Sequence, residues 1–299
     1  MDMNIWKVFS AVALFAVGSG YAHAAGDLPT KFTNMGSIGN SRHNLTQQQA
    51  SGGGPLSGAM DFSRNNYAEV CVYCHTPHGA NAAVTLPLWN RTLKVTTYTT
   101  YNQLGTSTLT QTVSQPGASS LACLSCHDGQ TAIDSIVNMP GSGRYSAAQT
   151  TTENTAFLDA WPGTQATGSH SGLADPGCVS CHKPGVPGAT DFTAFAIGTD
   201  LRNDHPVGIT FPSTNGPGTD FRTPAGVKGT TRYFDDNGNG KFDSADVRLY
   251  DTGGAVQVEC ASCHDPHGVP SGAPGSVFKP TFLRVANTSS ALCLTCHSK

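Results

Sequence analysis

The sequence predicts a chain that is mostly coil, with short helices and few strands, around a core that aliphatic side chains alone do not fill. Glycine (34) and proline (18) are frequent among the 299 residues, which favours loops. Leu, Ile, Val and Phe together supply only 56 residues, a share low enough to raise the question of disorder. Charged residues make up 12% and the net charge is −3, so the high charge of disordered chains is absent.

The N-terminal residues 1–24 have the features of a secretory signal peptide. Lys7 supplies a positive charge, residues 8–17 are apolar, and Ala22-His23-Ala24 has the small-x-small pattern of a cleavage site. The apolar run is about half as long as a membrane span. We therefore expect an exported chain whose residues 25–299 form a single domain, with no membrane span and no nucleic-acid partner. The alternative is a buried N-terminal helix.

All ten cysteines belong to five copies of the pattern Cys-x-x-Cys-His. An exported chain rich in cysteine would otherwise suggest disulfides, and isolated CxxC pairs would suggest zinc or thioredoxin-like sites. The five copies begin at Cys71, Cys123, Cys178, Cys260 and Cys293.

The repeated pattern is the attachment signature of c-type haem. Two thiols about one helical turn apart form thioethers with the haem, and the histidine that follows binds the iron. The predicted thioether residues are Cys71, Cys74, Cys123, Cys126, Cys178, Cys181, Cys260, Cys263, Cys293 and Cys296. The predicted proximal iron ligands are His75, His127, His182, His264 and His297. Five apolar haems would replace the missing aliphatic core.

The remaining histidines match the number of haems. Once the proximal ligands and His23 of the signal are set aside, five remain as candidate distal ligands: His43, His78, His170, His205 and His267. If all five bind iron, no haem keeps an open position for a substrate, and the irons only gain and pass electrons. The alternative distal ligand, Met, is offered only by Met35, Met60 and Met139, which we interpret as packing residues.

Two of the free histidines follow a proximal histidine by three residues. The segments His75-Thr-Pro-His78-Gly79 and His264-Asp-Pro-His267-Gly268 repeat one pattern. The second histidine cannot reach the far face of its own haem, because the proximal histidine already holds the near face. We therefore expect it to bind the iron of a neighbouring haem.

The haem motifs also repeat as pairs. The sequence Ser-Ser-x-x-Cys-Leu-x-Cys-His occurs at residues 119–127 and again at 289–297. Each copy closes a two-haem unit, at about 71–127 and about 260–297, and the haem at 178–182 lies between the units. Such duplication suggests a chain of stacked haems.

Secondary structure is weakly signalled. We expect a short helix around each haem motif. Residues 92–112 are rich in Thr and Tyr, which favours a short hairpin there. Gly, Ser, Thr, Asn and Pro dominate elsewhere and predict coil.

A second candidate site is a loop of the EF-hand type at residues 235–246. Oxygen-bearing side chains occupy loop positions 1, 3, 5, 9 and 12, Gly240 stands at position 6, and position 7 would offer its carbonyl. The loop ends in Asp instead of Glu, as in dockerin-type loops, which weakens binding. The alternative is a turn that binds no metal. The candidate calcium ligands are Asp235, Asn237, Asn239, Lys241, Asp243 and Asp246.

These motifs resemble a known family. The segments at 41–46, 71–80, 87–91 and 203–208 are similar to those of the doubled-CxxCH multihaem cytochromes of metal-reducing bacteria, which include outer-surface cytochromes that form conductive filaments. The resemblance implies bis-histidine haems and electron transfer without substrate turnover. In filament-forming members an adjacent subunit donates one histidine ligand, and His43 is the candidate for that role. Five haems depart from the four, six or eight of the filament cytochromes.

Three functions therefore remain open. The first is extracellular or outer-surface electron transfer, as a filament that passes electrons to an extracellular acceptor. The second is a discrete periplasmic carrier that exchanges electrons with other redox proteins. The third is a multihaem reductase, which requires an iron with an open position. None of the five motifs carries the Lys that often replaces the proximal His at such an iron.

Overall fold

The computed structural model describes residues 36–45, 69–91, 93, 97–138, 172–174, 177–187, 189, 191–272 and 276–299. The predicted signal peptide and His170 lie outside the described residues. Within them, coil predominates, with short helices and one small sheet, as the sequence predicts. No helix in the described ranges is long and apolar enough to cross a membrane.

Each of the five haem motifs lies on a short helical segment, which confirms the prediction for these segments. The first motif begins in the 3-10 helix Cys71–Tyr73. The others lie on the α-helices α1 (Ala118–His127), α3 (Cys178–Cys181), α4 (Cys260–Cys263) and α5 (Ala291–Cys296). Further 3-10 helices span Ile38–Asn40, Tyr101–Leu104, Thr193–Phe195, Pro280–Phe282 and Thr288–Ser290.

The sheet has five antiparallel strands in the order β1-β5-β4-β3-β2. The strands are β1 (Ile209–Thr210), β2 (Gly226–Lys228), β3 (Thr231–Phe234), β4 (Val247–Asp251) and β5 (Val256–Val258). The sequence did not predict this sheet. The candidate calcium loop is the connection between β3 and β4, so its two ends are held by paired strands.

The hairpin predicted over residues 92–112 is wrong for the described residues 97–112. Tyr101–Leu104 forms a 3-10 helix instead. Thr99 bridges to Asp200 in parallel, and the Thr210 amide donates to the Thr112 carbonyl at 2.8 Å. The extended residues thus pair with remote segments, which satisfies their backbone groups without a local turn.

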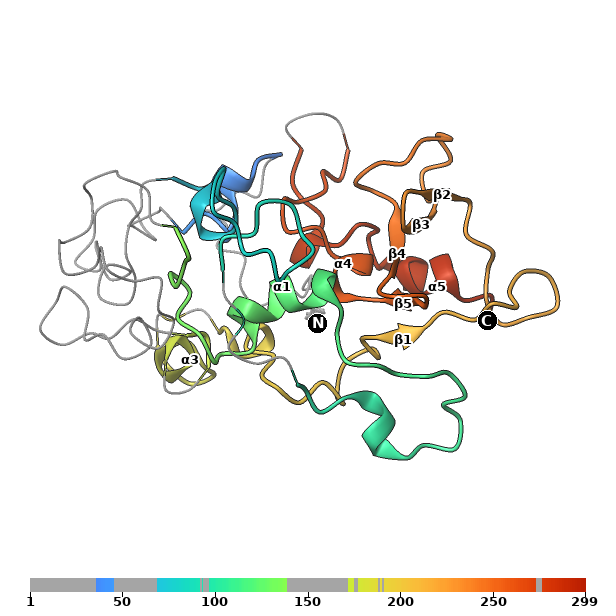
Figure 1. Cartoon of the computed structure of the whole chain (residues 1–299), viewed down its shortest axis with the longest axis horizontal. Coiled ribbons are helices and arrows are strands. Elements are labelled where there is room, and N and C mark those ends of the chain that lie inside the picture. The colour runs from blue at the N-terminus through green and yellow to red at the C-terminus, as the bar shows by residue number, and fades with distance from the viewer. Residues whose placement is uncertain are drawn as a thin grey trace, which may run out of the picture.

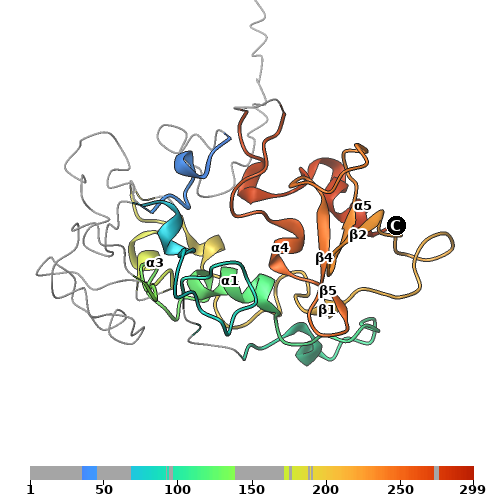
Figure 2. The same ribbon diagram turned by 45° about the horizontal axis from the view of Figure 1, so that its top comes forward.

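The helices lie in a consistent order in both ribbon views. Helix α1 lies between α3 and α4, and the sheet with α5 lies beyond α4 (Figures 1 and 2). Ten of the eighteen buried hydrophobic residues in the described ranges form three separate small clusters, around Tyr73, Leu124 and Leu249. The protein part of the core is therefore divided among the haem motifs instead of forming one continuous interior.

Candidate haem-binding centre

The cysteine side chains are placed for attachment to a cofactor. All ten are free thiols, and none forms a disulfide. Within each motif the two cysteines are three residues apart on a helical segment, so they share one helix face. Burial raises the pKa of the Cys74 thiol to about 12, so it is an unreactive neutral thiol until it is attached.

Interactions between cysteines of different motifs indicate an order for four of the five motifs. The Cys123 thiol interacts directly with that of Cys260, and this contact and burial raise the pKa of Cys123. Electrostatic interactions join the remaining neighbouring motifs through Cys74 with Cys126, and through Cys263 with Cys293 and Cys296. The first, second, fourth and fifth motifs therefore adjoin in that sequence.

The third motif adjoins the second. The His127 ring contacts the Phe195 carbonyl through Nδ1 at 2.7 Å, and the Gly198 amide donates to the His127 carbonyl at 3.1 Å. The Phe192 amide donates to the His182 carbonyl, and the Phe192 ring stacks on the His182 ring at 3.9 Å between centroids. The segment 192–198 thus connects the two motifs.

Two distal candidates face proximal histidines of other motifs. The rings of His75 and His267 are 6.2 Å apart between centroids, and their planes differ by 10°. The rings of His43 and His127 are 6.4 Å apart, with planes at 78°. Each pair joins residues that are remote in the sequence, so the fold itself brings them together.

A third pairing is indicated by electrostatics. The pKa of His205 is lowered by burial and also by the nearby His297 ring. His78 lies on the turn after the first motif, where the Asn138 side-chain amide donates to its carbonyl at 2.6 Å. These contacts do not assign a histidine partner to His78 or to the proximal His182 and His264.

The separation within the ring pairs fits one metal ion held between them. About 2 Å for each bond from an imidazole nitrogen to a metal, and about 1 Å from that nitrogen to the ring centroid, put two rings on one ion about 6 Å apart. The observed 6.2 and 6.4 Å agree with this spacing. These two ring pairs therefore have the separation that one metal ion bound by both imidazoles would require.

Hydrogen bonds at Nδ1 also prepare these rings as ligands. Backbone carbonyls or a carboxylate lie within 3.2 Å of Nδ1 in six histidines, which fixes the proton there and leaves Nε2 as the free lone pair. The histidines and their acceptors are His43 with Pro266, His75 with Pro87, His127 with Phe195, His205 with Pro206, His264 with Thr281, and His267 with Asp265.

The electrostatic environment favours neutral rings at most of these positions. Burial disfavours the charged form and lowers the pKa of His43 to about 4. Burial likewise lowers the pKa values of His127 and His264. His267 differs, because its hydrogen bond to the Asp265 carboxylate raises its pKa. A carboxylate on Nδ1 makes an imidazole a stronger donor to a metal.

Asn90 and Arg91 join the first two motifs from inside the protein, which the sequence did not predict. Both are fully buried. The Asn90 amide donates to the Val72 carbonyl at 2.7 Å, within the first motif. The Arg91 guanidinium donates to the backbone and hydroxyl of Ser125, within the second, and to two carbonyls of residues 132–133.

We expect Arg91→Met to destabilise the haem-loaded protein by about 3 kcal/mol, because it leaves buried carbonyls without donors. Urea denaturation followed by Soret absorbance measures the loss. The matched control is Arg202→Met, whose exposed ion pair with Asp200 contributes little. Equal midpoints for the two variants would contradict a structural role for Arg91.

Glu259 joins the second and fourth motifs. Its buried carboxylate accepts hydrogen bonds from the Gly117 amide and the Ser120 hydroxyl at the start of α1. The Ser120 hydroxyl in turn accepts from the Cys260 amide at 2.8 Å. Burial raises the pKa of Glu259. The N-terminal ends of α1 and α4 are therefore fixed to one shared carboxylate.

The candidate calcium loop is closed by its own side chains. The Asp235 carboxylate accepts from the Asn239 and Gly240 amides, and the Asp243 carboxylate accepts from the side-chain amides of Asn237 and Asn239. The Asn239 side chain also accepts from the Lys241 amide at 2.7 Å. The loop therefore has a closed conformation in which these predicted ligands are hydrogen-bonded within the loop.

Asp246, at the last position of the loop, has a buried acceptor that lacks a donor. Its side chain is fully buried, and its Oδ2 accepts from the Asp243 amide at 2.8 Å. Its Oδ1 has no hydrogen-bond partner in the described structure, and an unsatisfied buried carboxylate oxygen is costly. No group of three or more His, Cys, Asp or Glu side chains in the described residues already converges on one point. A cation would satisfy Oδ1 and draw the other ligands inward.

Comparison with known proteins agrees with the motif analysis at the C-terminal end. A family model described as the doubled CXXCH motif matches residues 254–299, which contain the fourth and fifth motifs. No curated protein sequence matches the chain. The doubled CXXCH match supports a chain that binds covalent haem, as a multihaem c-type cytochrome does.

Proposed function

We propose that this protein transfers electrons through five covalently attached c-type haems, each bound by two histidines. The observation that carries the proposal is the pair of histidine contacts at metal-bridging separation, His75 with His267 and His43 with His127. A haem whose iron is bound by two histidines would supply a one-electron couple at an iron that no substrate can reach. The protein attaches the cofactor, orients the imidazoles through Nδ1, and keeps most of the rings neutral.

The assignment of ligands follows from the contacts. His75 and His267 would hold the haem on Cys71 and Cys74. The ring pair of His127 with His43 supports their assignment to the haem on Cys123 and Cys126. We assign His297 and His205 to the haem on Cys293 and Cys296, and their electrostatic interaction supports this. His78 and the predicted ligand His170 are left for the haems whose proximal ligands are His182 and His264.

The order of adjoining motifs supports a route for electrons. The direct interaction of Cys123 with Cys260 and the electrostatic interactions of Cys74 with Cys126 and of Cys263 with Cys293 support a line of four haems, with the third haem beside the second. The route would run from the first motif at one end to the sheet and α5 at the other.

The ferric absorption spectrum tests the bis-histidine proposal. We expect mass spectrometry to find five haems per chain and the spectrum to show only low-spin iron. A high-spin signal from one haem in five would favour the reductase instead, because it would reveal an open iron.

We infer that the protein works outside the cytoplasm, as an extracellular filament or, alternatively, as a discrete periplasmic carrier. The signal-like residues 1–24 support export. The contact between His43 and His127 supports ligation within one chain, and donation of His43 to a neighbouring subunit stays a prediction. Electron microscopy of the concentrated, secreted protein decides between the forms: filaments support the first, and single uniform particles the second.

We expect His78→Ala to remove a ligand from a haem other than the one on Cys71 and Cys74. The proximal His75 holds the near face of that haem, and the contact of His267 with His75 indicates that its far face is taken. The high-spin signal of the variant should therefore persist when Cys71 and Cys74 are both replaced by Ala. Disappearance of the signal in that background would contradict the prediction.

We also propose that the loop at 235–246 binds one calcium ion through the predicted ligands. The unsatisfied Oδ1 of Asp246 is the supporting observation. Calcium prefers such carboxylate, amide and carbonyl oxygens. Isothermal titration with calcium chloride should give one site per chain in the native protein and none in Asp246→Asn.

A further inference from the structure

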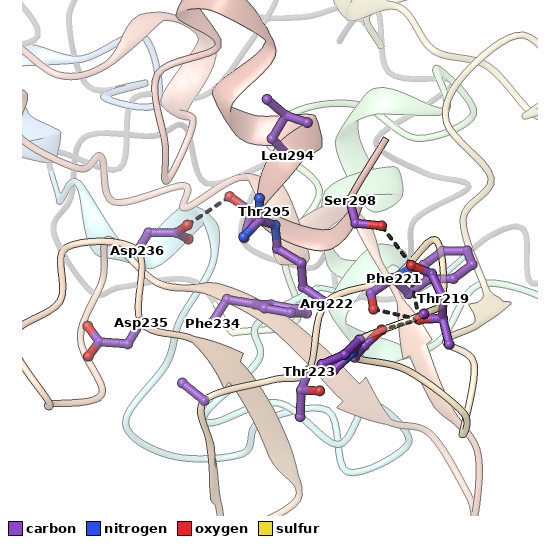
Figure 3. A pocket seen from close by; sticks show the side chains of 14 residues that line it. Thr219, Phe221, Arg222, Thr223, Phe234, Asp235, Asp236, Leu294, Thr295 and Ser298 are labelled. Atoms are coloured by element: carbon purple, nitrogen blue, oxygen red, sulfur yellow. Dashed lines mark hydrogen bonds between the residues drawn. The ribbon is translucent and has the colours of Figure 1, made fainter.

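The candidate calcium loop is bonded to a haem motif through Asp236. This residue occupies position 2 of the loop, so it is not among the predicted ligands. Its Oδ1 accepts a hydrogen bond from the Thr295 hydroxyl at 2.7 Å (Figure 3). Its Oδ2 accepts from the Val247 amide at 3.3 Å, directly after the last loop ligand. Asp236 therefore closes the loop on one side and reaches α5 on the other.

Thr295 is one of the two residues between Cys293 and Cys296. It is buried, and its hydroxyl also contacts the Ala291 carbonyl one turn earlier in α5. Asp236 and Thr295 both line a pocket of about 680 Å³, together with Leu294 of α5 and Asp235 of the loop (Figure 3). Since intervening residues of the motif line this pocket, the loop holds α5 from the side opposite to the predicted thioethers.

A second link joins the loop to the neighbouring haem motif. The buried Arg284 guanidinium donates to the carbonyl of Ser244, inside the loop, at 2.8 Å. It also donates to the carbonyl of Ala261, between Cys260 and Cys263, at 2.9 Å. The loop is therefore tied to the intervening residues of two adjoining haem motifs.

We propose that calcium bound at residues 235–246 is energetically coupled, through the bond between Asp236 and Thr295, to the oxidation state of the haem on Cys293 and Cys296. This inference rests on the haem and calcium binding proposed above. A cation beside a haem stabilises the reduced form, which carries one positive charge fewer than the oxidised form. An ordered loop would also fix the position of α5. Because coupling between two sites is reciprocal, reduction must tighten calcium binding by the same factor.

The experiment is an anaerobic isothermal titration of the haem-loaded protein with calcium chloride, in the oxidised and in the dithionite-reduced state. We expect about threefold tighter binding after reduction, which equals an upward shift of about 28 mV for one one-electron haem. Spectroelectrochemistry with and without calcium measures that shift independently. We expect only a modest change in calcium affinity because solvent and salt screen charges near the surface.

Two variants test the path of the coupling. Thr295→Val keeps the shape of the side chain and removes the hydroxyl that donates to Asp236. Calcium should still bind, but the ratio of calcium affinities between the reduced and oxidised states should fall by more than half. Ser298→Ala is the matched control, because Ser298 lines the same pocket and donates to the Thr219 carbonyl instead of the loop. Unchanged coupling in Thr295→Val would overturn the role of the Asp236 bond.

The failures of the separate proposals are distinguishable. Equal calcium affinity in both oxidation states overturns the coupling and leaves the calcium site standing. Absence of binding in either state overturns the calcium site, and with it the coupling. A mass spectrum without haem on Cys293 and Cys296 overturns the haem assignment on which the inference rests.

Discussion

The chain produced without haem attachment should fail to fold. Ten of the eighteen buried hydrophobic residues of the described structure lie in three clusters, of three, four and three residues, and none of these clusters resembles the core of a domain this size. Small apolar cores seldom outweigh the conformational entropy that folding removes. We expect no cooperative urea transition for the haem-free chain, and a cooperative one for the loaded protein.

The measurement needs a control in which only one of the predicted haems is missing. Cys178→Ala with Cys181→Ala removes one predicted haem at the side of the assembly and leaves the line of four motifs. That variant should keep a cooperative transition at lower urea, whereas the haem-free wild type should have none. A compact haem-free chain with dispersed amide resonances would show that the scarce aliphatic residues suffice after all. Haem would then no longer account for the low aliphatic content of the chain.

The helical haem motifs could be predicted because their chemistry is local. Two cysteines and a histidine must lie within five residues to reach one haem, so the spacing is visible in the sequence. The coil content was equally predictable from glycine and proline. The pairing of distal with proximal histidines could not be predicted, because partners such as His43 and His127 are remote in the sequence and are brought together only by the fold.

The sheet and the buried polar residues escaped prediction for physical reasons. Strands of two to five residues are too short to show a clear alternation of apolar and polar residues. Residues 92–112 have a stronger preference for β structure, but no neighbouring segment among the described residues pairs with them as a strand. Asn90 and Arg91 are polar and would ordinarily be expected at the surface. They are buried because the backbone carbonyls of the haem motifs need donors.

Replacing His267 with alanine should convert one haem in five to high-spin iron, and that haem should be the one on Cys71 and Cys74. The reason is the contact of the His267 and His75 rings, which are nearly parallel and 6.2 Å apart. His267 follows His264 by three residues, so the sequence predicts only that it binds a haem other than the one on its own motif. The ring pair with His75 identifies that neighbouring haem as the first.

The identity of the affected haem can be established by removing it. In a background of Cys71→Ala with Cys74→Ala, the first haem is absent, and His267→Ala should add no high-spin signal. In the same background His205→Ala should still add one, because we assign His205 to the haem of His297, whose ring interacts electrostatically with it. A new signal from His267→Ala in this background would place His267 on another iron.

The supporting hydrogen bond allows a milder and independent version of the test. Asp265 accepts from Nδ1 of His267 at 3.0 Å and is itself held by Arg284 at 3.1 Å. Asp265→Asn should leave the ligand in place but weaken its donation, because the neutral amide no longer polarises the ring. The reduction potential of the first haem should therefore rise while its iron stays low-spin. A shift confined to the fourth haem would instead place His267 on the iron of its own motif, against both the sequence pattern and the ring pair with His75. The two haem units would then no longer be joined through His267.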